Sequence, residues 1–165
     1  MRQRYVWLCV WFLLWWLCAL LAGYVLALAG PITNQRGTFQ TWLTLGSTAN
    51  TNAVLGSIIT PLSTGYQQTE CLLDGTWSGT IAAQAGMALW VCTEINSVYE
   101  DCDATLLSAR RPDAVFPLRA GAGGVQRVKQ TILMPPGPLK ALMQNVSGTT
   151  LTSGTLTCQP YTPGN

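Results

Sequence analysis

Residues 5–29 read YVWLCVWFLLWWLCALLAGYVLALA, an apolar stretch with no charged residue and no proline. As a helix it would be roughly 37 Å long at about 1.5 Å rise per residue. A bilayer has a hydrocarbon core of about 30 Å, so the stretch is long enough to cross it with some tilt. It predicts a single transmembrane helix, with residues 1–29 forming a cytoplasmic stub and a membrane anchor.

A cleaved leader is the alternative interpretation of this stretch. Arg2 and Arg4 precede it, and Ala27-Leu28-Ala29 has the small-x-small form at which signal peptidases cut. We favour a retained signal anchor, because the apolar part of a leader is usually only about 7 to 15 residues long. The next basic residue is Arg36, so the positive-inside rule predicts a cytoplasmic N-terminus. Residues 30–165 are then expected outside a plasma or inner membrane, in the periplasm or the extracellular space.

Two stripes of side chains recur every four residues along the predicted helix. Small residues on one stripe let another helix approach closely in lipid, and tryptophans form the other stripe. The two sets are Ala19, Gly23 and Ala27, and Trp7, Trp11 and Trp15. They predict a surface that docks to other membrane subunits; the alternative is an ordinary lipid-facing helix.

Beyond the anchor, residues 30–37 predict a polar hinge, and residues 38–165 are long enough for one domain with its own core. Nine basic residues less Arg2 and Arg4 leave seven, which balance the seven acidic residues. This neutral balance is not typical of a nucleic-acid-binding protein, so no nucleic-acid partner is expected. Six of the seven basic side chains fall within residues 110–140 and form a candidate basic patch: Arg110, Arg111, Arg119, Arg127, Lys129 and Lys140. The alternative is that they scatter over the surface or face the acidic residues of the same domain.

Four cysteines lie outside the predicted membrane helix: Cys71, Cys92, Cys102 and Cys158. An even number in an oxidising compartment predicts two disulfides, with three possible connectivities. We favour Cys92 with Cys102, which leaves Cys71 with Cys158. The chain has no histidine and no paired cysteine spacing, so neither a metal site nor a cofactor is predicted.

Short β-branched and aromatic runs separated by Gly, Pro, Asn and Ser predict a mainly β domain, a sandwich or a barrel. The expected strands cover residues 38–45, 53–60, 88–95, 114–118 and 125–134. Residues 81–88 could instead form one or two helical turns. Residues 139–146 predict a short helix, because Leu139, Leu142, Met143 and Val146 are spaced for one helical face. Turns are expected at Asp74-Gly75 and, within a closing hairpin, at Ser153-Gly154.

Catalytic and modification motifs are few. VQRVKQTILMPPG, residues 125–137, resembles the lysine-bearing strand of type I signal peptidases, which would imply a catalytic base at Lys129. The Ser-Met-x-Pro box of that family is absent. Asn145-Val146-Ser147 fits an N-glycosylation sequon.

The sequence therefore predicts a non-catalytic, single-pass accessory subunit of a larger membrane complex. Its helix would dock laterally while its disulfide-tied β domain covers the outer face, and its partners would be other membrane subunits and the lipid bilayer. The first alternative is a membrane-anchored surface or envelope protein that recognises an external partner. A serine-lysine membrane peptidase is the third hypothesis.

Overall fold

The computed structural model describes residues 11, 14–19, 35–60, 66–95, 98–99, 102–103, 110–135 and 137–162. The chain separates into two compact units, Met1–Thr33 with Gly164–Asn165, and Asn34–Pro163. In the first unit, residue 11 and residues 14–19 are helical. Within the described residues, no helix is both long enough and apolar enough to cross a membrane. Most of the predicted transmembrane stretch lies outside those residues.

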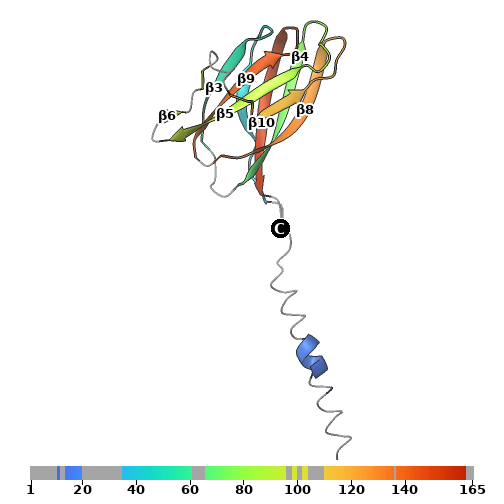
Figure 1. The fold of residues 1–165 in the computed structure, drawn as a ribbon, viewed down its shortest axis with the longest axis vertical. Coiled ribbons are helices and arrows are strands. Elements are labelled where there is room, and N and C mark those ends of the chain that lie inside the picture. The colour runs from blue at the N-terminus through green and yellow to red at the C-terminus, as the bar shows by residue number, and fades with distance from the viewer. Residues whose placement is uncertain are drawn as a thin grey trace, which may run out of the picture. The chain divides into compact units, whose positions relative to one another are not determined.

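The second unit is built from two antiparallel sheets that pack face to face (Figure 1). Sheet A contains β1 (Gln35–Arg36), β2 (Gln40–Leu45), β4 (Gln68–Trp77), β8 (Gly124–Leu133) and β10 (Leu151–Thr162). Sheet B contains β3 (Ala53–Ile59), β5 (Gly86–Ile95), β6 (Val98–Tyr99), β7 (Ala114–Pro117) and β9 (Leu139–Val146). The mainly β fold expected from the sequence is confirmed, and it is a sandwich.

The strand order identifies the kind of sandwich. In sheet A the strand order is β2-β10-β4-β8, and β1 also pairs with β10, on the same side as β2. In sheet B the order is β3-β9-β5-β7, and β6 pairs with the last residues of β5, on the same side as β7. Successive long strands mostly alternate between the sheets. The last two strands lie between earlier ones, β9 between β3 and β5, and β10 between β2 and β4. This is the connectivity of a double-sheet jelly roll.

The core lies between the two sheets, where the alternation of each strand turns apolar side chains inward. Trp77 and Leu73 of β4 face the same interior as Leu89 of β5. The largest side chains that are fully buried there, besides these, include Leu45, Ile81, Met87, Phe116, Leu139, Met143, Leu151 and Leu156.

Both disulfides have the favoured pairing. Cys71 and Cys158 are directly opposite residues on β4 and β10, both fully buried, and their Cα atoms are 4.0 Å apart. Cys92 of β5 is joined to Cys102, ten residues along the chain. One disulfide therefore crosses the middle of sheet A, and the other fastens a loop to sheet B.

The helix predicted at residues 139–146 is wrong, because these residues form β9. Leu139, Ala141 and Met143 belong to the main core, whereas Leu142 lies in a second apolar cluster with Trp90 on the other face of the sheet. Because Leu142 adds a buried apolar residue on the outer face, the apolar residues of this strand do not alternate strictly, and their spacing resembled that of a helix.

Two predicted turns are also wrong, and for a shared reason. Gly75 and Gly154 are opposite each other within β4 and β10, near the end of the first and the start of the second. A Cβ on Gly75 would lie 2.8 Å from the indole of Trp77 and 2.9 Å from Leu151, and one on Gly154 would lie 2.9 Å from the Asp74 carbonyl oxygen. The glycines leave room for these neighbours inside the sandwich rather than bending the chain. Residues 151–162 form one continuous strand instead of a hairpin.

Smaller corrections concern the ends of elements. Gln35 and Arg36, expected in the polar hinge, pair with β10 as β1. The helical turns considered for residues 81–88 are not formed, since Ile81 makes an isolated bridge to Gly121 and β5 begins at Gly86.

Candidate functional site: the two edges of sheet B

The outer side of β5 is covered by three successive features. β7 pairs with residues 86–89 of β5, and β6 pairs with Glu94 and Ile95. Between them, the backbone of Val91 is bonded by side chains instead of by a strand. We call this side of sheet B the β5 edge.

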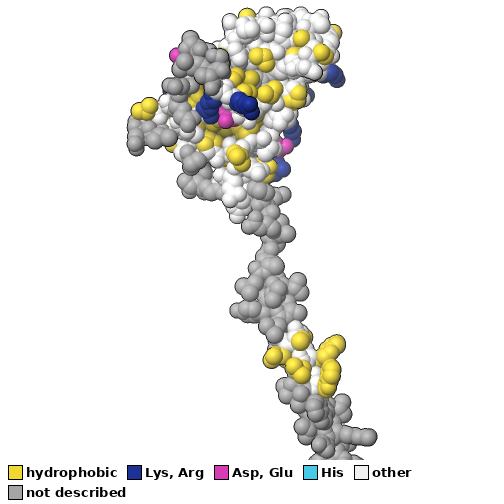
Figure 2. Space-filling view, in the orientation of Figure 1, with side chains coloured by type: hydrophobic (Ala, Val, Ile, Leu, Met, Phe, Trp, Pro, Cys, Tyr) yellow, Lys and Arg dark blue, Asp and Glu magenta, His cyan; other side chains and the backbone are white. Residues whose placement is uncertain are grey.

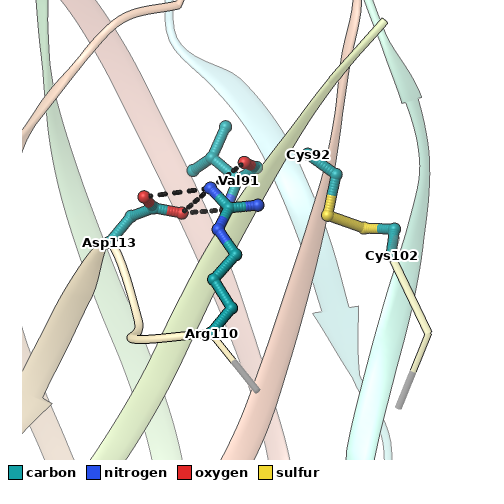
Figure 3. Close-up of a disulfide and its surroundings, with 5 residues drawn as sticks. All are labelled: Val91, Cys92, Cys102, Arg110 and Asp113. Carbon is teal, nitrogen blue, oxygen red and sulfur yellow. Dashed lines mark hydrogen bonds and ion pairs between the residues drawn. A yellow bond between two sulfur atoms is a disulfide. The ribbon is translucent and has the colours of Figure 1, made fainter. Parts of the chain in front are cut away.

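Arg110 and Asp113 make the side-chain clasp at Val91 (Figure 3). The Val91 amide donates to Asp113 Oδ2 at 2.7 Å, and Arg110 Nη2 donates to the Val91 carbonyl at 3.2 Å. Arg110 and Asp113 also form an ion pair of 3.2 Å. The carboxylate and the guanidinium thus imitate the acceptor and the donor of a neighbouring strand, which protects an edge against pairing with another chain.

Two further links hold the clasp in place. The indole Nε1 of Trp90 donates to the Arg110 carbonyl at 3.1 Å, and the Asp113 amide donates to the Leu89 carbonyl at 2.8 Å. The Cys92–Cys102 disulfide lies beside the clasp in Figure 3 and fastens the loop that precedes it. The sequence placed Arg110 in a basic patch and gave no signal that it would bond β5.

A cleft of about 310 Å³ opens beside the clasp, between β5 and the end of β8. One charged pair, Arg110 and Asp113, lies in a lining that is otherwise largely apolar: Val91, Thr93, Ile132, Leu133, Met134 and Pro135. Figure 2 shows basic and acidic side chains lying together among hydrophobic ones near the middle of the β domain. The volume is at the lower end of the range for small-ligand sites.

The opposite side of sheet B ends at β3, and we call residues 53–60 the β3 edge. Among the described strands, β3 pairs only with β9. Leu55 is opposite Leu142 and Ile58 is opposite Lys140, so Gly56 and Ser57 together face only Ala141. This is a β-bulge, a feature that bends a strand and is frequent at sheet edges and binding sites.

A second bulge faces the first from sheet A. Thr41 and Leu43 of β2 are opposite consecutive residues of β10, which leaves Trp42 as the extra residue. A Cβ on Gly56 would lie 2.8 Å from Leu43 Cδ2 and 2.9 Å from the Trp42 carbonyl oxygen. The two strands meet at a cleft of about 290 Å³, lined by β2 and β3 residues alone.

The β3 edge is apolar and uncharged. Leu55 is 47% exposed and Ile58 is 57% exposed. No residue of β2 or β3 carries a charge, and of the described residues that pair with β3 only Lys140 is charged. The Lys140 ammonium lies 4.4 Å from the ring centroid of Tyr99 on β6, at the other side of the sheet.

The six residues of the predicted basic patch do not share one face. Arg127 and Lys129 lie on the outer face of sheet A, where they pair with Asp74 at 2.7 Å and Glu70 at 3.1 Å. Lys140 lies on the outer face of sheet B, and Arg110 and Arg111 lie in the loop before β7. Arg119 follows β7, and its backbone amide is bonded by the buried side chain of Gln126.

Neighbouring groups shift the pKa values of two side chains, Glu70 and Tyr99. The hydrogen bond from Lys129 lowers the pKa of Glu70, and Arg36 adds to this, while desolvation of the carboxylate opposes it. Desolvation raises the pKa of Tyr99, as does its hydrogen bond to Glu94. Lys129 itself is 64% exposed and ion-paired, an arrangement that does not suit a peptidase mechanism, which needs a desolvated, neutral lysine.

The sequon at residues 145–147 is buried in the folded domain. Asn145 Nδ2 donates to the carbonyl oxygens of Thr48 at 2.9 Å and Thr149 at 2.8 Å, and Asn145 Oδ1 accepts from the Ser147 amide. Both Asn145 and Ser147 are fully buried. The amide therefore ties the loop after β2 to the loop after β9, and the sequon match reflects this structural role.

The remaining sequence-predicted residues fall largely outside the described part of the chain. Trp7, Gly23 and Ala27 lie outside it, while Ala19, Trp11 and Trp15 are helical and exposed. The described residues contain no group of three His, Cys, Asp or Glu side chains that could hold a metal ion. Comparison with known proteins finds no family model and no curated sequence that matches this chain.

Proposed function

We propose that this chain is a non-catalytic, single-pass accessory subunit of a membrane complex, which docks to other subunits through its helix and through the β3 edge of its external β domain. The uncharged residues 5–29 and the placement of Arg2 and Arg4 support the anchor and its orientation. Two disulfides in a small domain fit an oxidising compartment outside the cytoplasm.

The observation that carries the proposal is the state of the β3 edge. Its exposed Leu55 and Ile58 and its lack of charge contrast with the covered β5 edge. A sheet edge of this kind is a template for pairing with another chain, which natural proteins block unless they use it.

The test is purification of the full-length chain from its native membranes in a mild detergent, followed by mass spectrometry of the intact protein and of co-purifying subunits. We expect a full-length chain in fixed ratio with other membrane proteins. Ile58→Lys should release these partners. Val125→Lys, at the exposed start of β8 and outside both clefts, is the matched control and should retain them. A mass beginning at residue 30 would identify a cleaved leader and rule out the anchor.

A second function is favoured by the cleft at the β5 edge. Its volume of about 310 Å³ and its single charged pair suit recognition of a small external group by a surface protein. The two functions respond differently to Leu substitutions at Ala19, Gly23 and Ala27. An accessory subunit should separate from its complex, whereas an anchored recognition protein should keep its external ligand.

A further inference from the structure

We infer that the Cys92–Cys102 disulfide is a redox switch, which a dithiol opens in the folded domain while the Cys71–Cys158 disulfide stays closed. Opening the bond releases Cys102 and exposes Trp90 on the outer face of sheet B. The switch needs neither the β3 edge nor the membrane anchor, so it goes beyond the proposed function.

The two disulfides differ in their access to solvent. Cys71 and Cys158 are both 0% exposed and belong to the core between the sheets. Cys92 is also buried, but its partner Cys102 is partly exposed. A disulfide is reduced when a thiolate attacks one of its sulfur atoms, so the reaction requires access. A reductant can therefore approach the second bond from the side of Cys102, whereas the first is reached only if the sandwich opens.

The fold around the second disulfide does not depend on it. Cys92 belongs to β5, which pairs with β9 over residues 86–93 and with β7 over residues 86–89. Cys102 belongs to no strand. Breaking the bond therefore removes one attachment of Cys102 and leaves the backbone hydrogen bonds of β5 in place. The expected change is a local opening of the structure rather than unfolding of the domain.

The reaction is a two-electron thiol–disulfide exchange. One thiolate of the dithiol attacks Sγ of Cys102 and forms a mixed disulfide with it, while the S–S bond breaks and Cys92 leaves as a thiolate that takes up a proton. The second thiol of the reductant then attacks the mixed disulfide and releases Cys102 as a thiol. The protein gains two thiols, and the dithiol is oxidised to a cyclic disulfide.

Cys102 packs against an apolar cluster on the outer face of sheet B, formed by Ala88, Trp90 and Leu142. Trp90 is 5% exposed and Leu142 is 1% exposed while the bond is closed. These two residues are directly opposite each other on β5 and β9. Once the bond is open, Cys102 is no longer held against them, and the Trp90 indole gains exposure. The reduced domain thus presents an apolar surface that the oxidised domain covers.

The first experiment titrates the full-length chain in detergent with dithiothreitol, in a background of Cys9→Ser and Cys18→Ser. Free thiols are labelled with iodoacetamide and located by peptide mass spectrometry. We expect labels on Cys92 and Cys102 at a dithiothreitol concentration about tenfold lower than the one needed for the other two cysteines. Reduction of both disulfides at one concentration, or of the core disulfide first, would contradict the inference.

The second experiment measures whether opening the bond exposes Trp90. Hydroxyl-radical footprinting of the same chain, read by peptide mass spectrometry, compares the oxidised protein with protein reduced only at Cys92–Cys102. We expect labelling of Trp90 to rise about threefold, and labelling of Trp77, which is 2% exposed in the core, to stay unchanged. Cys92→Ser combined with Cys102→Ser should show the same raised labelling without reductant. Unchanged labelling of Trp90 in the reduced protein would overturn the inference. A rise at both tryptophans would also overturn it, by showing that reduction unfolds the domain.

Discussion

The two edges of sheet B differ in how far their backbone is covered: the β5 edge is bonded by other segments of the chain, and β3 pairs only with β9 among the described strands. On the β5 edge, two short strands, a guanidinium and a carboxylate satisfy the outward backbone of one strand, and a disulfide fastens the loop that supplies them. On the β3 edge, Leu55 and Ile58 are exposed beside a bulge, without a charge on the strand. Natural proteins block sheet edges with charges, bulges or covering segments, and of these the β3 edge has the bulge but no charge, which is why we propose that another chain docks there.

The largest expected effect is the loss of stability when a disulfide is removed, and it should differ between Cys71–Cys158 inside sheet A and Cys92–Cys102 at the β5 edge. Closing a longer loop removes more entropy from the unfolded chain. Replacing Cys71 and Cys158 by alanine, which opens a loop with a sequence separation of 87, should cost about 4 to 5 kcal/mol of unfolding free energy. Replacing Cys92 and Cys102, with a separation of 10, should cost about 2 to 3 kcal/mol. Urea unfolding of each pair in detergent gives both values, and equal losses would contradict the loop-length argument.

The next effect tests the packing behind the β3 edge. The Cβ introduced by Gly56→Ala would meet Leu43 Cδ2 and the backbone oxygens of Trp42 and Ala141, of which the oxygens cannot move aside. We expect a loss of about 1 to 3 kcal/mol in unfolding free energy. Gly46→Ala is the control, because a Cβ there has no neighbour within 4 Å. If both variants melted like the wild type, the two bulges would not be in close contact.

A smaller effect tests the clasp of the β5 edge. Asp113→Ala leaves the Val91 amide without its acceptor and removes the ion pair between Asp113 and Arg110, which should cost about 1 to 2 kcal/mol. Arg111→Ala, at the exposed neighbouring residue, should change stability by less than about 0.5 kcal/mol. Hydrogen exchange of the Val91 amide should accelerate only in the first variant. Unchanged exchange would show that the clasp does not protect the edge.

The smallest effect concerns the charges on β8, the outer strand of sheet A. The folded pKa of Glu70 is lower than its ordinary value of 4.5. The stabilisation from Glu70 is therefore present above that pH and is lost as the pH falls below it, through the folded pKa. Lys129→Met should weaken this loss, visible as a flatter dependence of the urea midpoint on pH below about 4.5. Lys140 lies over the Tyr99 ring and not beside Glu70, so Lys140→Met should keep the wild-type dependence of the urea midpoint on pH.

The sequence located some strands and missed others, and burial does not separate the two groups. β5 is buried on both faces over most of its length and was expected at residues 88–95, whereas the regularly alternating β4 was not expected. β3 and β8 were located because β-branched residues alternate or cluster between turn signals. β9 was missed because Leu142, which packs with Trp90 on the outer face, breaks the alternation of residues 139–146 and gives their apolar side chains a helix-like spacing. Gly75 and Gly154 were misread because a cross-strand glycine pair and a turn look alike in one sequence.

The candidate site depended even more on contacts between distant residues. The favoured disulfides followed from cysteine number and spacing, but the clasp required Arg110 and Asp113 to reach the backbone of β5 some 20 residues away. The sequence shows that residues 53–60 carry no charge, but only the topology shows that they form an edge strand.

The burial of Asn145 bears on how the chain can be made. In a eukaryotic secretory pathway, the sequon at residues 145–147 meets the glycosylation machinery before the domain has folded. A glycan on Nδ2 would occupy the atom that must donate to Thr48 and Thr149, at a position with no solvent access. Modified chains would therefore be excluded from the native state during biosynthesis. Production in a bacterial periplasm, where disulfides form without this modification, suits the chain, and so does a secretory host if its Asn145 remains unglycosylated.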